Sequence, residues 1–303
     1  MTFARGIQTR LAIGTQADFS TDAAAMATIP YVSHSLDITK ERLSGDTVST
    51  DRLSRIDYHG SRQVAGEIVV EMRSIDFDPL LESALLSTFT TSGVLSHGAT
   101  EQFLTVEDGA LDISQYRKFQ SCVVNSMAIS AQPNSFVLGT FDVIGKDMVQ
   151  GTSQLAAPAA VSSGGGSWDV FSGAIYEGGT ATGDMLAIVS SLDFTLSNSY
   201  APVFDLTSAS ASRFEYSRSV LEGQLVVYYE DATLINKFLN ETESSLQITF
   251  DDRVSGSAYT FDMPRIKLNG AAVPVGDVKS RFITLPFVAL ADDNGVQLEI
   301  SKS

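Results

Sequence analysis

The sequence lacks several features that whole classes of protein require. A single cysteine, Cys122, excludes an internal disulfide bond and any zinc site built from cysteines. Only three histidines are present, which leaves little for metal binding or acid–base catalysis. No apolar run reaches the roughly 18 residues that a transmembrane helix needs, so no membrane partner is expected. Residues 1–15 contain Arg5 and Arg10 with no apolar core between them, so they do not predict a signal peptide.

Basic residues are also scarce. The chain has 20 lysines and arginines against 36 aspartates and glutamates, which gives a formal net charge of −16. A protein that grips nucleic acid through its phosphates needs a basic face, and this balance argues against one. It does not exclude a protein that lets DNA pass without holding it.

Sequence motifs for catalysis are absent as well. The chain contains no glycine-rich phosphate-binding loop, no His-Glu-x-x-His motif and no Gly-x-Ser-x-Gly motif. A hydrolase that uses two carboxylates stays open, because such residues meet only in the fold. We therefore expect no enzyme, no cofactor, and no catalytic or metal-binding residue.

What the sequence does contain is an internal repeat, in which three short motifs recur in the same order. Residues 36–39 (LDIT) recur as 192–195 (LDFT), 55–58 (RIDY) as 213–216 (RFEY), and 66–70 (GEIVV) as 223–227 (GQLVV). The spacing between the first and last motif is nearly equal in the two copies. A short helix follows each copy, with Asp78 and Asp231 expected as its N-caps and a leucine-rich stripe on one face.

The remaining segments predict strands. Residues 67–72 alternate, with Ile68, Val70 and Met72 on one face and Glu67 and Glu71 on the other. Between the copies, residues 151–167 are rich in Ala, Ser and Gly, which is typical of a flexible linker. We therefore expect a mainly β protein with two tandem β-domains, residues 1–150 and 168–303, each with one short flanking helix.

Each copy also contains a long polar excursion between two predicted strands, residues 40–62 in the first and 196–219 in the second. Such a stretch is unusual in a compact domain unless it has a function, although an ordinary surface loop is the alternative. An arm that reaches a neighbouring subunit is one such function. The candidate contact residues are Lys40, Glu41, Arg42, Asp46, Asp51, Arg52, Arg55, Tyr200 and Phe204.

Taken together, the order of these segments resembles the tail tube proteins of long-tailed bacteriophages, in the duplicated form of that family. The resemblance covers nearly the whole chain, and its specificity comes from the number and order of the segments, because none has a chemical fingerprint. The segments that carry it are residues 124–130, 132–134, 138–146, 171–179, 191–196 and 231–246.

The resemblance implies a β-sandwich or split barrel with one flanking helix per domain. It further implies that three two-domain chains form a ring with pseudo-six-fold symmetry. Rings would stack into a tube in the virion after assembly in the host cytoplasm, with the long arms contacting the next ring. The implied partners are other copies of the chain, the tape measure protein in the lumen, and the tail terminator and distal tail proteins at the tube ends. Double-stranded DNA would pass through without specific binding.

An acidic or neutral lumen fits such a conduit, because a basic one would bind DNA through counterion release and stall it. Candidate lumen-facing acids are Glu67, Glu71 and Glu222. Two other interpretations remain open. One is the related tube of a contractile injection or type VI secretion apparatus, which usually has a single domain per chain. The other is a monomeric β-sandwich binding module with an aromatic platform such as Tyr216, Tyr228 and Tyr229.

Overall fold

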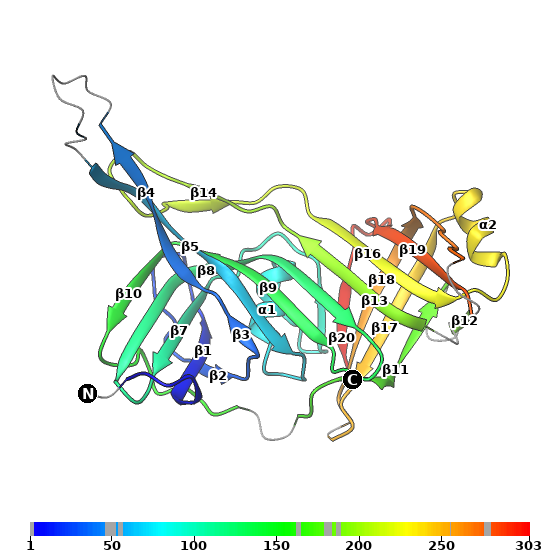
Figure 1. Cartoon of the computed structure of the whole chain (residues 1–303), viewed down its shortest axis with the longest axis horizontal. Helices are drawn as coiled ribbons and strands as arrows, with labels where there is room; N and C mark the ends of the chain where they lie inside the picture. The colour runs from blue at the N-terminus through cyan, green and yellow to red at the C-terminus, as the bar shows by residue number, and fades with distance from the viewer. Residues whose placement is uncertain are drawn as a thin grey trace.

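The computed structural model describes residues 3–45, 53, 57–161, 165–178, 184–185, 189–254, 256–275 and 280–303. It is mainly β, with about half of the chain in strands and two short α-helices. Figure 1 shows two β-rich halves side by side, with β4 and β5 extending away at one end. The elements in chain order are η1 (Gly6–Gln8), β1 (Thr9–Thr15), β2 (Ala27–Ile29), β3 (Ser33–His34), β4 (Asp37–Ser44), β5 (Asp57–Glu71), α1 (Asp78–Leu85), β6 (Val94–Ser96), β7 (Leu104–Ala110), β8 (Gln115–Ala131), β9 (Leu138–Gly145), β10 (Asp147–Gly151), β11 (Asp169–Glu177), β12 (Asp184–Met185), β13 (Val189–Ser197), β14 (Ala201–Val203), β15 (Arg213–Glu215), β16 (Val220–Tyr228), α2 (Thr233–Leu239), β17 (Ser244–Asp251), β18 (Ala258–Leu268), β19 (Phe282–Ala289) and β20 (Glu299–Lys302).

The first half contains two antiparallel layers that share the long strand β8. One layer has the order β2–β1–β7–β8–β10, and the other has the order β4–β5–β9–β8. Ile13 and Phe119 from the first layer and Ile68 and Phe141 from the second belong to one buried apolar cluster. The alternation at the end of β5 has its cause in this packing, since Val64, Ile68 and Val70 enter this core while Glu67 and Glu71 face away from it.

The second half repeats this pairing pattern. One layer has the order β12–β11–β17–β18–β20, and the other has the order β13–β16–β19–β18. Each pairing corresponds to one in the first half when β1 is matched to β11, β2 to β12, β4 to β13, β5 to β16, β7 to β17, β8 to β18, β9 to β19 and β10 to β20. The helix also falls in the same place, between β5 and β7 and between β16 and β17.

The two halves are joined through backbone ladders. The C-terminal part of β8 pairs with β13, and β20 at the end of the chain pairs with β6. One apolar cluster runs through both halves. Trp168 is fully buried and stacks on Phe250, with ring centroids 5.8 Å apart. The connection between the halves is partly held as well, because Ala159 and Met26 pair through their backbones.

The helices begin at slightly different positions from those expected. Asp78 is the first residue of α1 rather than its N-cap, because its carboxylate accepts a hydrogen bond from the Tyr259 hydroxyl at 2.9 Å and pairs with Lys302. Ala232 occupies the N-cap position of α2. The carboxylate of Asp231, one residue earlier, accepts a hydrogen bond from the backbone N–H of Thr233 at 2.8 Å. Neither helix, nor any other in the described part of the chain, has the length and apolarity to cross a bilayer.

Candidate assembly surface

A continuous layer of strands runs through both halves and defines the candidate functional surface. Its order is β4–β5–β9–β8–β13–β16–β19–β18, in which all neighbours are antiparallel. Beyond β18, residues 270–275 continue along β19, since Ala272 and Thr284 form a bridge with two backbone hydrogen bonds of 3.1 and 2.9 Å. The layer therefore ends in β4 on one side and in residues 270–275 on the other.

One face of this layer packs on the core, and the opposite face is acidic. Side chains on alternate positions of β5, β9, β13 and β16 face away from the core, as the burial patterns of these strands show. No described lysine or arginine on β5, β9, β13 or β16 occupies that face, whereas Lys267 on β18 does, because it lies opposite Val288, which in turn lies opposite Glu222. The acids that do are Asp37, Glu67, Glu71, Asp142, Asp193 and Glu222.

Neutral donors hold two of these carboxylates. Asn125 donates its side-chain amide to Asp142 at 2.7 Å, and the Ser130 hydroxyl donates to Asp193 at 2.6 Å. Glu67 lies directly opposite Asp142 in the β5–β9 ladder, although like charges in that position repel each other. The face therefore keeps its negative charge, because its polar contacts orient the carboxylates without neutralising them.

The sequence predicted part of this face. Glu67, Glu71 and Glu222 lie on it as the alternation indicated, with Glu67 and Glu222 exposed and Glu71 partly buried. Sequence reasoning missed Asp37, Asp142 and Asp193. The signal for them is the same alternation, because Asp142 lies between Phe141 and Val143, which are buried, and Asp193 between Leu192 and Phe194.

The first predicted arm is a hairpin of β4 and β5 that extends beyond the core (Figure 1). Lys40, Glu41 and Arg42 are exposed on β4, and Arg42 pairs with Asp57 at 3.0 Å. The four remaining candidates, Asp46, Asp51, Arg52 and Arg55, lie outside the described residues.

The second predicted arm, residues 196–219, folds back on the first half of the same chain. Tyr200 is only 9% exposed and belongs to an apolar cluster with Phe214, Val123 and Ile144. Burial raises the pKa of its phenol, so this hydroxyl stays protonated. Phe204 is 38% exposed. Of the two aromatic candidates, the structure therefore uses Tyr200 within the chain and leaves Phe204 accessible.

Polar contacts also fasten this second arm. Arg62 on β5 donates to the Ser210 hydroxyl at 2.9 Å and pairs with Asp147 at 2.6 Å, and its backbone N–H donates to Ala209. The Asn198 side chain donates to the backbone oxygens of Ala84 and Val124. The arm of the second half thus covers the neighbouring first half at the β8–β13 junction.

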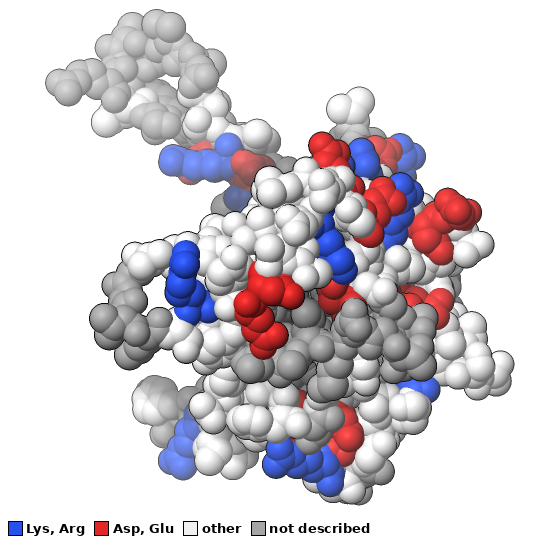
Figure 2. Space-filling view, turned by 90° about the vertical axis from the view of Figure 1, so that its right-hand side faces the viewer, with Lys and Arg blue, Asp and Glu red and all other residues white. Residues whose placement is uncertain are grey.

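Surface charge at the other end of the molecule is mixed. Figure 2 looks onto the side that lies at the right of Figure 1, where acids and bases alternate. Ion pairs there include Lys237 with Glu177 at 2.7 Å and Arg265 with Glu243 at 2.6 Å. Among the described residues on this side, the bases are therefore paired with acids and do not form the basic patch that nucleic-acid binding requires.

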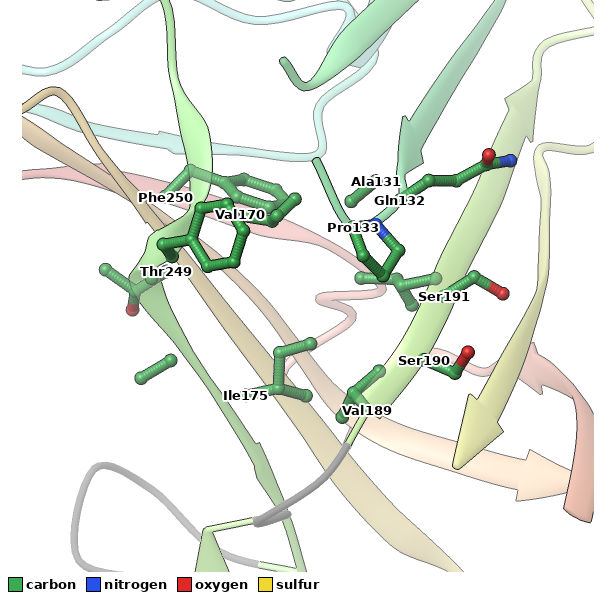
Figure 3. Close-up of a pocket in the computed structure, with 14 residues that line it drawn as sticks. Ala131, Gln132, Pro133, Val170, Ile175, Val189, Ser190, Ser191, Thr249 and Phe250 are labelled. Atoms are coloured by element: carbon green, nitrogen blue, oxygen red, sulfur yellow. The ribbon is translucent and has the colours of Figure 1, made fainter. Parts of the chain in front are cut away.

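A cavity of about 270 Å³ lies between β11 and β13 (Figure 3). Its described lining is apolar or neutral, with Val170, Ile175 and Phe250 on one side and Pro133 and Val189 on the other. None of the described lining residues has a titratable side chain. The described residues also contain no cluster of histidine, cysteine and carboxylate groups that could hold a metal ion.

The comparisons with known proteins agree with a structural role. No curated protein matches the sequence. The family model described as "Phage tail tube protein" matches residues 6–289, which is nearly the whole chain. The chain therefore belongs to the phage tail tube protein family and is a structural component of the virion tail, not an enzyme.

Proposed function

We propose that this protein is a duplicated tube subunit, of which three copies form a ring with pseudo-six-fold symmetry. Stacked rings would form the tail tube that conducts DNA into the host. The observation that carries the proposal is the β8–β13 ladder, which joins the layers of the two halves edge to edge within one chain. A contact that joins two similar units once can join further units in the same way.

An internal duplication is supported by the recurrence of the strand pairings in the two halves. Gly66 on β5 and Gly223 on β16 add detail to this match. A Cβ atom at Gly66 would lie 2.6 Å from the backbone oxygen of Ser35, and one at Gly223 would lie 2.6 Å from that of Asp193. Each glycine therefore allows the neighbouring backbone, at Ser35 in one half and at Asp193 in the other, to approach closely.

Ring closure is supported by the two open ends of the layer. Exposed strand edges invite pairing with another chain, and natural β-proteins usually cover or charge them. Here one end is β4 and the other is residues 270–275, an uncharged stretch in which Val275 is 75% exposed. Three chains in a ring would pair every such edge with a partner.

The acidic face then becomes the wall of the channel. A DNA duplex carries about one negative charge per 1.7 Å of its axis. Repulsion from Glu67, Asp142, Asp193 and Glu222 would keep the duplex away from the wall, so the channel conducts DNA without binding it. The tape measure protein would occupy this channel during assembly in the host cytoplasm.

Stacking is the role proposed for the first arm. The β4–β5 hairpin extends beyond the core of its own half, so it can reach a second ring (Figure 1). Its described exposed charges, Lys40, Glu41 and Arg42, suit a polar contact between rings. At the two ends of the tube, where no further ring follows, the tail terminator and distal tail proteins would take the place of the next ring.

Negative-stain electron microscopy of the concentrated protein, with rotational averaging of end-on views, tests this proposal. Rings with a central hole and three-fold symmetry modulated toward six-fold support it. True six-fold rings would mean that six chains surround the channel and would refute the three-chain ring. Ring assembly would be refuted if the purified protein gave only monomeric particles and if intact tails contained no rings of this protein in their tube.

A further inference from the structure

We propose a specific register for the contact between chains: β4 of one chain pairs antiparallel with residues 270–275 of the next, with Leu36 opposite Val273 and Ile38 opposite Ala271. This inference rests on the proposed ring. It adds the residues that meet, because the contact inside each chain serves as a template for the contact between chains.

The template is the β8–β13 ladder. Phe194 lies opposite Ile129, Thr195 opposite Ala128, and Leu196 opposite Met127. The backbone N–H of Asn198 donates to the oxygen of Asn125 at 2.9 Å, which extends the same register by one hydrogen-bonded pair. Even-numbered residues of β13 therefore bond to odd-numbered residues of β8.

The positions of Gly66 and Gly223 show which residues at the start of β4 correspond to which residues of β13. Phe194 lies opposite Gly223 in the β13–β16 ladder. In the first half, Ser35 donates to Glu67 and Asp37 lies opposite Ala65, which places Leu36 opposite Gly66. Leu36 thus corresponds to Phe194, and Ile38 corresponds to Leu196.

The pairing partners on β9 and β19 show which of residues 270–275 correspond to which residues of β8. Gly66 lies opposite Val143 and Gly223 opposite Phe287, so Thr140 and Thr284, three residues earlier, correspond to each other. Ala128 is opposite Thr140, and Ala272 is bridged to Thr284. Ala272 therefore corresponds to Ala128. It follows that Ala271 corresponds to Met127 and Val273 to Ile129.

Backbone direction provides an independent check on this register. Ser35 donates to Glu67 on β5, so the backbone groups of Leu36 and Ile38, which alternate with it, point away from β5. Ala272 bonds to Thr284 on β19, so the groups of Ala271 and Val273 point to the open side. The proposed register brings these outward groups together in hydrogen-bonded pairs, and a slip of one residue would separate them.

Side-chain direction gives a second check. Leu36 is buried in the main apolar cluster, and Ile38, Ala271 and Val273 pack against it from partly buried positions. The register places all four on the core side of the joined layer. Pro274 has no backbone N–H. Because it follows Val273, its backbone nitrogen faces β19 and not the open edge, so the lack of a donor there does not interrupt pairing at that edge.

Side chains near the open edge are more exposed than their counterparts near the β8–β13 junction, as expected if a second chain covers that edge. Leu86, at the end of α1, is 3% exposed and shares a cluster with Tyr200 of the second arm, whereas Leu239, at the end of α2, is 66% exposed.

The Val273 oxygen at the open edge already accepts one hydrogen bond, from the Arg281 side chain at 3.2 Å. A carbonyl has two lone pairs, so that oxygen can accept a second hydrogen bond from Leu36 of the next chain.

Cysteine cross-linking tests the register. Asp37 and Ala272 are both exposed and would form a non-hydrogen-bonded pair, whose Cα atoms are about 4.5 Å apart, within the range of a disulfide. The variant Asp37→Cys/Ala272→Cys is oxidised under ring-forming conditions. Its matched control is Ser33→Cys/Ala272→Cys, in which the exposed Ser33 position lies about 13 Å further along the edge. Circular dichroism verifies that both variants fold.

The expected result is a ladder of cross-linked dimers and trimers on denaturing gels, at least ten-fold more abundant for the first variant than for the control. Rings that form without this preference would overturn the register and leave the ring proposal intact. Absence of both rings and cross-links would count against both proposals. The native Cys122 does not interfere, because it is fully buried.

Discussion

Replacing Gly223 by alanine tests the close approach of strands on which both the duplication and the register depend. The added Cβ would lie 2.4 Å from Cζ of Phe287 and 2.6 Å from the backbone oxygen of Asp193. The ring of Phe287 is buried, so it has little room to move, and the oxygen belongs to the neighbouring strand. The strand β13 must therefore shift away from β16.

The magnitude follows from two opposing effects. Alanine in place of glycine restricts the unfolded chain and on its own stabilises by about 0.4–1 kcal/mol where the backbone permits it. Overpacking in a dense core costs about 1–3 kcal/mol, and contact with rigid backbone places this site toward the upper end. We expect a net loss of about 2 kcal/mol in the free energy of unfolding. Gly66→Ala should lose at least as much, because its Cβ would meet Ser35 and Leu36 backbone atoms at 2.6 and 2.7 Å and its φ of +156° is rarely adopted by residues with a side chain.

The assay is urea unfolding followed by circular dichroism, at a concentration where size-exclusion chromatography shows monomers, since assembly itself raises apparent stability. Gly151→Ala is the control, because its Cβ would meet no atom closer than 3.7 Å. The control should be neutral or slightly stabilised. If Gly223→Ala unfolds at the wild-type urea concentration or above, the close approach of β13 and β16 is refuted.

Three further predictions concern other parts of the chain. Cys122 should not react with a thiol reagent at pH 8 in the native protein and should react fully in urea, because burial raises its pKa to about 12; native labelling would contradict its burial. Burial alone would raise the pKa of Asp108, but the neighbouring His34 and the hydrogen bonds from Arg117 outweigh it and lower the pKa. This carboxylate therefore stabilises the fold above its unfolded pKa near 3.8 and stops doing so as the pH falls through its lower folded value. Asp108→Asn should therefore lose about 1–3 kcal/mol at pH 6 by urea titration, and its difference from the wild type should shrink as the pH falls through the folded pKa of Asp108; a difference that stays constant as the pH falls would contradict the linkage. Deletion of residues 43–55 should leave circular dichroism and single rings unchanged while abolishing tubes in electron micrographs, and normal long tubes from this variant would exclude a stacking role for the arm.

Sequence periodicity predicted the mainly β character and the faces of the strands, because alternation is a local property that burial enforces residue by residue. It could not predict register. The repeat matched residues 36–39 to 192–195, whereas the ladders place Leu36 and Phe194 opposite the two glycines. A slip of two residues keeps every side chain on the same face, so hydrophobic pattern alone does not detect it.

The packing of the second arm against the first half could not be predicted from the sequence either. Tyr200 was a candidate for contact with another ring, yet it packs against Val123 and Ile144 of the first half. These partners lie more than fifty positions earlier in the chain, and nothing local to residues 196–219 identifies them. The residues 270–275 were overlooked for a related reason, since an open edge becomes visible only once the pairing of every neighbouring strand is known.

In the proposed ring, the tandem duplication that we infer would change the energetics of assembly. When two units belong to one chain, their contact forms without the loss of translational freedom that separate subunits incur, as the β8–β13 ladder does here. A pseudo-six-fold ring then needs three contacts between chains in place of six. The remaining edges must still avoid the wrong partner. Pairing of two β4 edges would bring the charged residues Lys40, Glu41 and Arg42 of both chains into one contact, whereas residues 270–275 carry no charge. The charges on β4 therefore favour the uncharged edge as its partner.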